Sequence, residues 1–347
     1  MMIESFTSQN VRKHLDINLK KWSVYATRRI LDPAIPMIAK ECSIILNNKE
    51  RPPTRRELLT GVRNRDAILC TLSDKIDRTV MDVAGSTLRV ISSYSTGVDH
   101  IDTEEATKRG IYVTTTGDIL TETVADLAFA LVLAISRQVT QGYELVIHKR
   151  WKVGADPNLL LGSDVHGMTM GILGLGRIGS AMARRAKGFD MPVIYHTRHG
   201  RNIELDKQLD TKYVDMDTLI EESDFLSLHC PLNTETYHLI NESKLRRMKK
   251  NSYIINTARG EIINEMHLIK ALKKKWIAGA GLDVFEKEPP SPNNLLLKMK
   301  NVVLLPHIGS ATFPTRTKMA EVAAENLLNV LNGKSPIYLA NQEVTGQ

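Results

Sequence analysis

The chain has 347 residues, of which 42% are hydrophobic and 24% charged, so its composition is that of a globular protein and excludes a largely disordered chain. The formal net charge of +7 is spread over many segments, and no aromatic residues interleave with the lysine clusters, which disfavours nucleic acid as a partner. The longest apolar run, residues 127–135, is too short to cross a bilayer, so no membrane partner is expected.

The sequence predicts a reducing compartment. Cys42, Cys70 and Cys230 are far apart and lie in or beside apolar runs, which indicates buried thiols and neither a disulfide framework nor a metal site. Residues 1–21 lack the apolar core of a secretion signal and are interpreted as a loosely held extension. A cytoplasmic protein is therefore expected, and organelle targeting by this basic extension stays open.

From Trp22 to about residue 119, short apolar runs alternate with helical patterns. Strands are expected at residues 23–27, 43–46, 67–70, 88–92 and 111–113. Helices are expected at 34–40, from the capping box of Thr54 and Glu57 to Gly61, at 78–84 before Gly85, and from Asp102 to Gly110. Alternation of this kind implies a mostly parallel sheet with helices on both faces.

The next two segments differ from this alternation. Residues 121–149 form one long helical pattern with a nearly all-apolar middle, which must be buried between domains or between subunits. Residues 150–165 have no clear periodicity and include Trp151, Pro157 and three leucines. Two interpretations of this arm stay open, an oligomer contact and a loop packed on its own domain.

A second alternating block begins at Met168. Its strands are expected at residues 168–173, 193–197, 225–229, 253–256, 278–284 and 302–305, and a final helix at 312–331 closes at Gly333.

The first strand of this block is followed by a glycine-rich turn with the sequence Gly174-Leu175-Gly176-Arg177-Ile178-Gly179 and then by a helical pattern. Gly174 allows the tight turn, Gly176 lets the backbone approach a pyrophosphate, and Gly179 lets the helix pack close to the strand. The N–H groups around Arg177 and Ile178 would face the phosphates. The turn therefore predicts a dinucleotide-binding site.

The second strand ends where such sites read the ribose. The sequence there is His196-Thr197-Arg198-His199-Gly200-Arg201, without the acid that NAD favours. Because arginine offers a planar, permanently charged fork to a 2′-phosphate, NADP(H) is predicted to be preferred over NAD(H). Arg198 is expected to be the main contact and Arg201 a weaker one, against the alternative that both are ordinary surface arginines.

The other strands of the block end in polar residues, and ligands of open α/β sheets bind at these carboxyl ends. Cys230-Pro231 follows the third strand, with a proline that can pack against adenine, and Arg259 follows the fourth. Asp283 and Glu288 follow the fifth, and His307 follows the sixth. An arginine, acids and a histidine thus fall at one edge of one sheet.

These residue types suit reduction of a keto acid. A histidine such as His307 can give a proton to the carbonyl oxygen, and a carboxylate such as Glu288 keeps it protonated. The fork of Arg259 can bind a carboxylate and the adjacent carbonyl together. Each residue alone has a simpler interpretation, as a surface histidine, a loop acid or a helix-start residue, but those interpretations do not predict all three at strand ends.

Four ordered motifs, GLGRIG, NTARGEIIN, GLDVFEKEPP and PHIGSAT, resemble the D-isomer-specific 2-hydroxyacid dehydrogenases, over nearly all of residues 22–336. Within that family the similarity is greatest to the glyoxylate reductase/hydroxypyruvate reductase group. The resemblance implies that Arg259 binds and polarises the substrate and that His307 is the general acid/base, paired with Glu288. The family's acid directly precedes the proline corresponding to Pro289, which selects Glu288 over Glu286.

The resemblance also implies a fold, with two doubly wound parallel-sheet α/β domains. A flavodoxin-like substrate domain, residues 22–119 and 311–341, would contain an inserted Rossmann NAD(P)-binding domain, residues 120–310. Family members are typically homodimers joined by the long helix and the arm, so a homodimer is expected.

Further contacts are implied for substrate and cofactor. The N–H groups of Gly97 and Val98 would hold the substrate carboxylate, beside Leu72, Ser73 and Thr96, and Asp283 would bond the nicotinamide amide. The remaining expected cofactor contacts are Gly174, Leu175, Gly176, Arg177, Ile178, Gly179, Thr197, Arg198, Arg201, Cys230, Pro231, Thr236, Thr257, Ala258 and Gly309. No metal site is expected.

Two functions stay open. The first is NADPH-dependent reduction of small 2-keto acids, glyoxylate to glycolate and hydroxypyruvate to D-glycerate. Beside Leu72, Ser73 and Thr96 are small and polar, which suits a two- or three-carbon acid. The second is a dinucleotide-sensing scaffold that binds proteins, as the corepressors resembling this family do. Those corepressors keep a similar arginine, acid and histidine, so Arg259, Glu288 and His307 do not separate the two functions.

Overall fold

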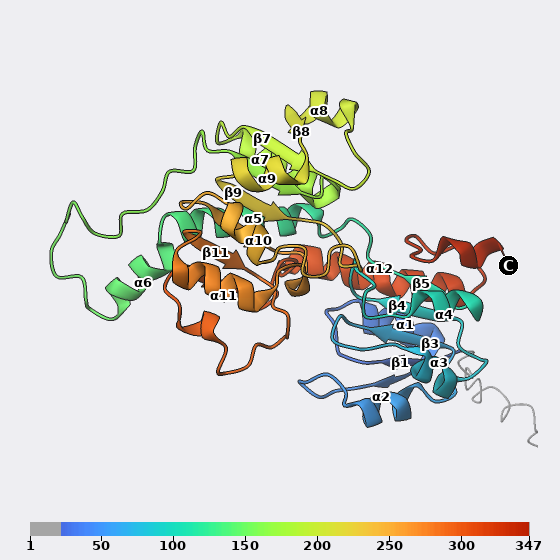
Figure 1. Cartoon of the computed structure of the whole chain (residues 1–347). Coiled ribbons are helices and arrows are strands. Elements are labelled where there is room, and N and C mark those ends of the chain that lie inside the picture. Colours follow the sequence, from blue (N-terminus) through green and yellow to red (C-terminus); the bar gives the residue numbers. More distant parts are fainter. Residues whose placement is uncertain (1–21, 347) are drawn as a thin grey trace, which may run out of the picture. The chain divides into compact units, whose positions relative to one another are not determined.

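The structure, a computed structural model, describes residues 22–346, and the expected extension at residues 1–21 lies outside them. The chain divides into two compact units (Figure 1). Among the described residues, unit 1 consists of 22–116 and 320–346, and unit 2 is the continuous segment Gly117–Met319.

Unit 1 is built on one parallel sheet with the strand order β2-β1-β3-β4-β5, the flavodoxin-like order. Its elements are β1 (Trp22–Ala26), α1 (Ala34–Glu41), β2 (Cys42–Leu46), α2 (Arg55–Val62), β3 (Ala67–Cys70), α3 (Arg78–Ala84), β4 (Val90–Ser93), α4 (Thr103–Lys108), β5 (Tyr112–Thr114), the second part of α12 (Phe313–Leu331) and the 3₁₀ turn η4 (Gln342–Gly346). Alternate strand residues enter two core clusters, because successive side chains point to opposite faces. Val24 and Leu69 pack with α1 and α12, and Tyr25 and Ile68 pack with α2, α3 and α4.

The predicted helix signals of unit 1 are present, with one correction. Thr54 and Glu57 form the expected capping box at the start of α2. Gly61, however, does not end this helix, which runs on to Val62. A Cβ at Gly61 would overlap the ring of Tyr25, so the glycine allows close packing of the helix on β1.

Unit 2 is built on a seven-stranded parallel sheet with the order β12-β11-β10-β9-β6-β7-β8. Counted from the strand before the glycine turn this is the Rossmann order with one further strand. Its elements are α5 (Thr121–Ser136), α6 (Val139–Ile147), β6 (Met170–Leu173), α7 (Arg177–Lys187), β7 (Val193–His196), α8 (Ile203–Leu209), β8 (Thr211–Tyr213), α9 (Met216–Glu222), β9 (Phe225–Leu228), α10 (Glu242–Arg247), β10 (Tyr253–Asn256), η2 (Gly260–Ile262), α11 (Glu265–Lys274), β11 (Gly279–Leu282), η3 (Leu295–Lys298), β12 (Val302–Leu304) and the first part of α12. One face of the sheet packs on α5 and α7, and the other on α9, α10 and α11.

The long helix predicted at residues 121–149 is wrong, because the chain forms two helices, α5 and α6, bent by 66°. Gln138, between them, has a left-handed backbone with φ of 50°. The N–H of Ser163 donates to the Ser136 carbonyl at 2.9 Å, and Gly162 lies so close that a Cβ would overlap that oxygen. Residues 162 and 163 therefore pack against the end of α5. A contact with such a distant part of the chain cannot be recognised from the local sequence pattern.

The two helices differ in burial. Eight of the 16 residues of α5 are buried, including Phe129 and Leu131, as the apolar pattern predicted. No residue of α6 is buried, and Figure 1 shows α6 and the arm after it extending away from the sheet of unit 2. Within residues 22–346 no single helix is long and apolar enough to cross a membrane; only α5 and α6, taken together as a bent pair, have the required length and composition.

Candidate active site

The glycine turn after β6 has three different environments for its three glycines. Gly174 has a φ of +96°, and a Cβ there would lie 2.8 Å from the N atom of Cys230. A Cβ at Gly179 would overlap the carbonyl oxygen of Gly174, so helix α7 packs tightly on the turn. A Cβ at Gly176 would meet nothing within 4 Å, so the space beside this backbone is open. This is the arrangement that the approach of a pyrophosphate requires.

Helix α7 begins at Arg177, directly after Gly176, and has no acid in its first turn. The first N–H groups of a helix have no partner within the helix and favour an anion. The three basic residues Arg184, Arg185 and Lys187 lie in the last turn, where they suit the opposite end of the helix dipole. Together with the open space at Gly176, this helix start fits a dinucleotide phosphate.

The two arginines after β7 are both exposed and lie in different surroundings. Arg198 pairs with Glu235 at 3.2 Å. Arg201 donates from Nε to Asp206 at 2.7 Å, and the Asp206 side chain is buried. Thr197, half-buried, begins this loop directly after His196, whose carbonyl accepts from the N–H of Gly174. The loop therefore starts beside the glycine turn.

The loop after β9 holds the predicted residues Cys230, Pro231 and Thr236. The Thr236 hydroxyl donates to the Pro231 carbonyl at 2.7 Å and accepts from the Asn233 N–H at 2.8 Å, which braces the turn. Burial raises the pKa of Cys230 to about 11, so this residue is a neutral thiol near neutral pH.

The loop after β10 carries Arg259 and is fixed by Asn256, which is buried. The Asn256 side chain donates to the Arg259 carbonyl at 2.8 Å and accepts from the Ala258 N–H at 3.0 Å. Gly260 lies against the next loop, where a Cβ would overlap the carbonyl of Phe285. The Thr257 hydroxyl is buried without a hydrogen-bond partner among the described residues, so a polar ligand group can still be bound there.

His307 and Glu288 are in contact. His307 Nδ1 lies 2.6 Å from Glu288 Oε2, and Glu288 Oε1 accepts from the Phe285 N–H at 3.1 Å. His307 has a φ of +53°, an uncommon backbone for a residue that is not glycine, and its N–H donates to the Asp283 carbonyl at 2.9 Å. Because Nδ1 faces the carboxylate, Nε2 is the nitrogen left for a reacting group.

The two glutamates of the loop after β11 have different partners. Glu286 Oε1 lies 2.7 Å from His238 Nε2 and accepts from the Glu265 N–H at 2.9 Å, at the start of α11. Of these two glutamates, Glu288 contacts His307 and Glu286 contacts His238.

Asp283 holds the loop of His307. Its two carboxylate oxygens accept from the N–H groups of Ile308 at 2.8 Å and Gly309 at 2.7 Å. Burial raises the pKa of Asp283, although these hydrogen bonds act in the opposite direction.

Arg259, Glu288 and His307 therefore follow three adjacent strands, β10, β11 and β12, at the same edge as the glycine turn. The loops of the first two touch through Gly260 and Phe285, and the last two side chains touch directly. Asn256 and Gly260 were not predicted as site residues. The glycine directly after Arg259 in the motif could have indicated close packing, but the sequence does not show its packing partner, Phe285, which is 25 positions away.

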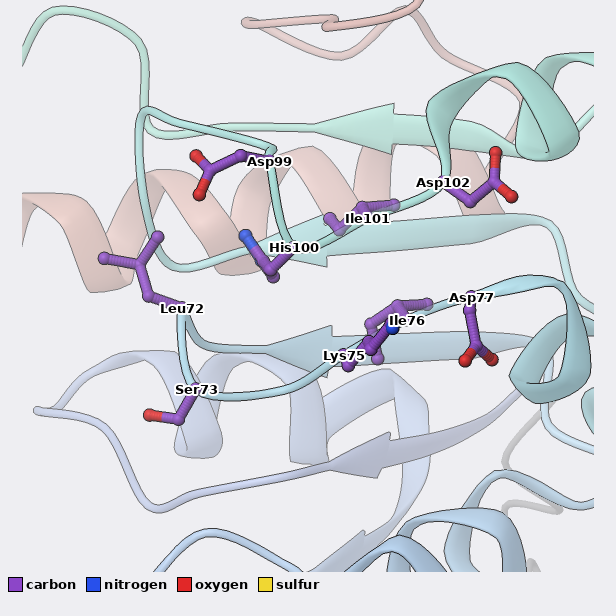
Figure 2. A pocket seen from close by; sticks show the side chains of 9 residues that line it. All are labelled: Leu72, Ser73, Lys75, Ile76, Asp77, Asp99, His100, Ile101 and Asp102. Atoms are coloured by element: carbon purple, nitrogen blue, oxygen red, sulfur yellow. The ribbon is translucent and has the colours of Figure 1, made fainter. Parts of the chain in front are cut away.

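The substrate residues predicted in unit 1 form two groups. Leu72 and Ser73 line a pocket of about 580 Å³, which is formed by residues 72, 73, 75–77 and 99–102 and does not include Thr96, Gly97 or Val98 (Figure 2). The Gly97 carbonyl accepts from Ser95 Oγ at 2.6 Å, and the Val98 carbonyl accepts from the Ile101 N–H at 2.9 Å. No group of His, Cys, Asp or Glu among residues 22–346 could hold a metal ion.

Comparison with known proteins agrees with this geometry. Residues 129–309 match the model of the D-isomer specific 2-hydroxyacid dehydrogenase, NAD binding domain. A glyoxylate reductase of Thermofilum pendens is 49% identical over 327 residues, which cover 92% of this chain and 95% of that protein. A glyoxylate reductase of Pyrococcus horikoshii is 48% identical, with 93% of this chain and 97% of that protein covered.

Among solved structures, an NADPH-dependent glyoxylate/hydroxypyruvate reductase from Sinorhizobium meliloti, in complex with NADP and malonate, has a TM-score of 0.81 and 31% identity, with 93% of this chain and 97% of that chain covered. Fold, site and relatives together define an oxidoreductase with a nicotinamide dinucleotide cofactor. The chain belongs to the D-isomer-specific 2-hydroxyacid dehydrogenase family.

Proposed function

We propose that this protein reduces glyoxylate to glycolate and hydroxypyruvate to D-glycerate, and that it prefers NADPH to NADH. The observation that carries the proposal is the 2.6 Å contact between His307 and Glu288 on the strand edge that also bears Arg259. The names of the relatives from Thermofilum and Pyrococcus support glyoxylate as substrate, and that of the Sinorhizobium enzyme supports hydroxypyruvate and NADPH.

His307 is the proton donor in this proposal. The Glu288 carboxylate faces Nδ1 and orients the ring, and Nε2 gives a proton to the carbonyl oxygen of the keto acid. A bound reduced nicotinamide supplies the hydride that the carbonyl carbon accepts. Arg259 binds the carboxylate and polarises the carbonyl, with its loop braced by Asn256.

The NADPH preference is supported by the loop after β7, where Arg198 and Arg201 occur without an acid at the ribose position. The loop residues Thr96, Gly97 and Val98, with Leu72 and Ser73, are proposed as further substrate contacts. The N–H groups of Gly97 and Val98 have no hydrogen-bond partner among the described residues, which supports binding of a carboxylate.

We also propose a homodimer and a cytoplasmic location. The exposed apolar residues of α6 and the arm support the homodimer, because large exposed patches mark interaction sites. Three free cysteines, two of them buried, support a reducing compartment.

Steady-state rates with glyoxylate, hydroxypyruvate, pyruvate and phenylpyruvate, each with NADPH and NADH, test the function. We expect the fastest turnover on the first two acids with NADPH. The fastest turnover on phenylpyruvate would exclude a small substrate, and negligible turnover on all four would favour the protein-binding scaffold.

Two variants test the roles of the site residues. His307→Gln should lower kcat by about 100-fold or more and leave cofactor affinity nearly unchanged, since it removes the proton donor. Arg259→Ala should raise KM for the keto acid and lower kcat together. His148→Gln, at the exposed position directly after α6, is the matched control and should behave as the wild type.

A further inference from the structure

The two arginines of the loop after β7 are held to different degrees. Arg198 and its partner Glu235 are 65% and 62% exposed, and ion pairs at such exposure contribute little and order their side chains poorly. Arg201 instead donates to Asp206, whose side chain is only 6% exposed. A charged hydrogen bond to a buried carboxylate fixes the guanidinium much more firmly.

Asp206 is itself fixed from the other side. Its Oδ1 accepts from the hydroxyl of Tyr195 at 2.7 Å, and Tyr195 is fully buried in β7. The same hydroxyl accepts from the N–H of Asn202 at 3.0 Å, where α8 is capped. A chain of hydrogen bonds therefore runs from the strand through Asp206 in α8 to Arg201.

The charge state of Asp206 agrees with this network. Burial raises the pKa of this carboxyl, but the hydrogen bonds from Tyr195 and Arg201 outweigh burial and lower the pKa overall. Asp206 is thus a carboxylate at neutral pH, and Arg201 is the cation that it binds.

Only Nε of Arg201 is used by this contact. The terminal nitrogens, Nη1 and Nη2, have no partner among the described residues, and the side chain is 63% exposed. These two nitrogens form the planar fork that binds phosphate through two parallel hydrogen bonds. The loop begins beside the glycine turn, through the hydrogen bond from Gly174 to His196.

We propose that Asp206 is a positioning residue for recognition of the 2′-phosphate of NADPH: held by Tyr195, it binds Nε of Arg201 and thereby presents the terminal nitrogens of Arg201 to the phosphate. Arg201, and not the loosely paired Arg198, is then the main phosphate contact. This inference rests on the proposed preference for NADPH.

Calorimetric titration of the full chain with 2′,5′-ADP and with 5′-AMP tests it, since the two probes differ only in the 2′-phosphate. In Arg201→Lys, which keeps the charge, and in Asp206→Asn and Tyr195→Phe, we expect 2′,5′-ADP to bind about tenfold more weakly, the equivalent of one lost charged hydrogen bond. Binding of 5′-AMP should stay within about twofold of the wild type, and Arg198→Lys, at the loosely paired arginine of the same loop, should change 2′,5′-ADP affinity less than about threefold.

A double-mutant cycle separates positioning from a general structural effect. In an Arg201→Ala background, Asp206→Asn should have no further effect on 2′,5′-ADP, because it acts through Arg201. Equally weakened binding of both nucleotides, or an unchanged ratio of the two affinities in all three variants, would overturn the inference while the NADPH preference stands. A wild type that binds the two nucleotides equally would overturn the NADPH preference itself. If Asp206→Asn does not fold, Arg201→Lys and Tyr195→Phe still decide between these outcomes.

Discussion

His229, at the end of β9, is a histidine that the proposed chemistry does not use. Its Nε2 lies 2.8 Å from the hydroxyl of Ser227, and burial lowers its pKa to about 4 from an ordinary value of 6.5. The imidazole is therefore neutral in the folded protein at pH 5 to 6, where the unfolded chain already takes up a proton.

A pH dependence of stability follows from this lowered pKa. Between pH 6.5 and about 4 the unfolded state binds more protons, so the free energy of unfolding should fall as the pH is lowered through this window, with about 3 kcal/mol due to His229. His229→Gln, which keeps a polar group near Ser227, should remove this contribution. Urea unfolding at pH 7, 6, 5 and 4 measures it. His199→Gln, at an exposed position, is the control, and an equal pH dependence in His229→Gln and the wild type would contradict the assignment.

Gly260 joins the arginine loop to the acid loop. Gly260→Ala should displace Arg259, because the new Cβ would overlap the Phe285 carbonyl, and kcat/KM for the keto acid should fall by about 100-fold. Steady-state kinetics and cofactor titration measure this effect, and cofactor affinity should change little. Gly154→Ala, where a Cβ meets nothing within 4 Å, is the matched control. Full activity of Gly260→Ala would show that the two loops do not depend on each other.

The residues with reactive side chains could be predicted from the sequence better than those that hold them. Strand ends and motif order pointed to His307, Glu288 and Arg259 because parallel strands bring their carboxyl ends to one edge. Asn256 and Gly260 act through backbone hydrogen bonds and close packing with residues distant in sequence, which no motif describes.

Among the elements, buried strands were easiest to predict from the sequence. The strands β3 and β10 have the predicted bounds, since their continuous apolar runs are buried on both faces. The strand β8 was missed, because it has only three residues, Thr211, Lys212 and Tyr213, and no apolar run. The break between α5 and α6 was also missed, because the contacts at the end of α5 come from residues 162 and 163, which are distant in sequence.

The glycine turn allows a prediction in which two similar substitutions have opposite effects. Gly176→Ala should leave stability within about 1 kcal/mol, since its Cβ meets no protein atom, but should weaken cofactor binding about tenfold or more by filling the space beside the backbone. Gly179→Ala should instead lower stability by about 2 kcal/mol, because its Cβ overlaps the Gly174 carbonyl. Thermal unfolding and titration with NADPH separate the two effects, and loss of stability in Gly176→Ala with normal cofactor binding would contradict this assignment.

For the whole molecule, the most unusual feature is the exposed apolar stripe of α6. Val139, Tyr143, Val146 and Ile147 are 48% to 65% exposed and recur at the spacing of one helix face. The arm adds four exposed apolar side chains, Trp151, Val153, Leu159 and Leu161.

If this surface joins two copies, Tyr143→Glu/Val146→Glu should convert the dimer into a monomer, because burying two carboxylates in an apolar interface is costly. Sedimentation or light scattering at several concentrations measures the molecular mass, 38.9 kDa for one chain. Thr140→Glu/His148→Glu adds the same charges at exposed positions in α6 and directly after it, and should remain dimeric. A wild-type monomer, or a dimer unaffected by the first pair, would exclude α6 as the interface.

Helix α12 belongs to both units, since the chain returns from unit 2 to unit 1 between Met319 and Ala320. Ala323 and Leu327 lie in the core of unit 1, and Ser92 donates to the Ala323 carbonyl at 2.8 Å. During synthesis on the ribosome, unit 2 emerges complete while unit 1 still lacks this part of its core. The part of unit 1 that precedes unit 2 must therefore wait for the part that follows it before its core is complete, and a nascent chain stalled before Ala320 would expose the face of β1, β3 and β4 that α12 covers.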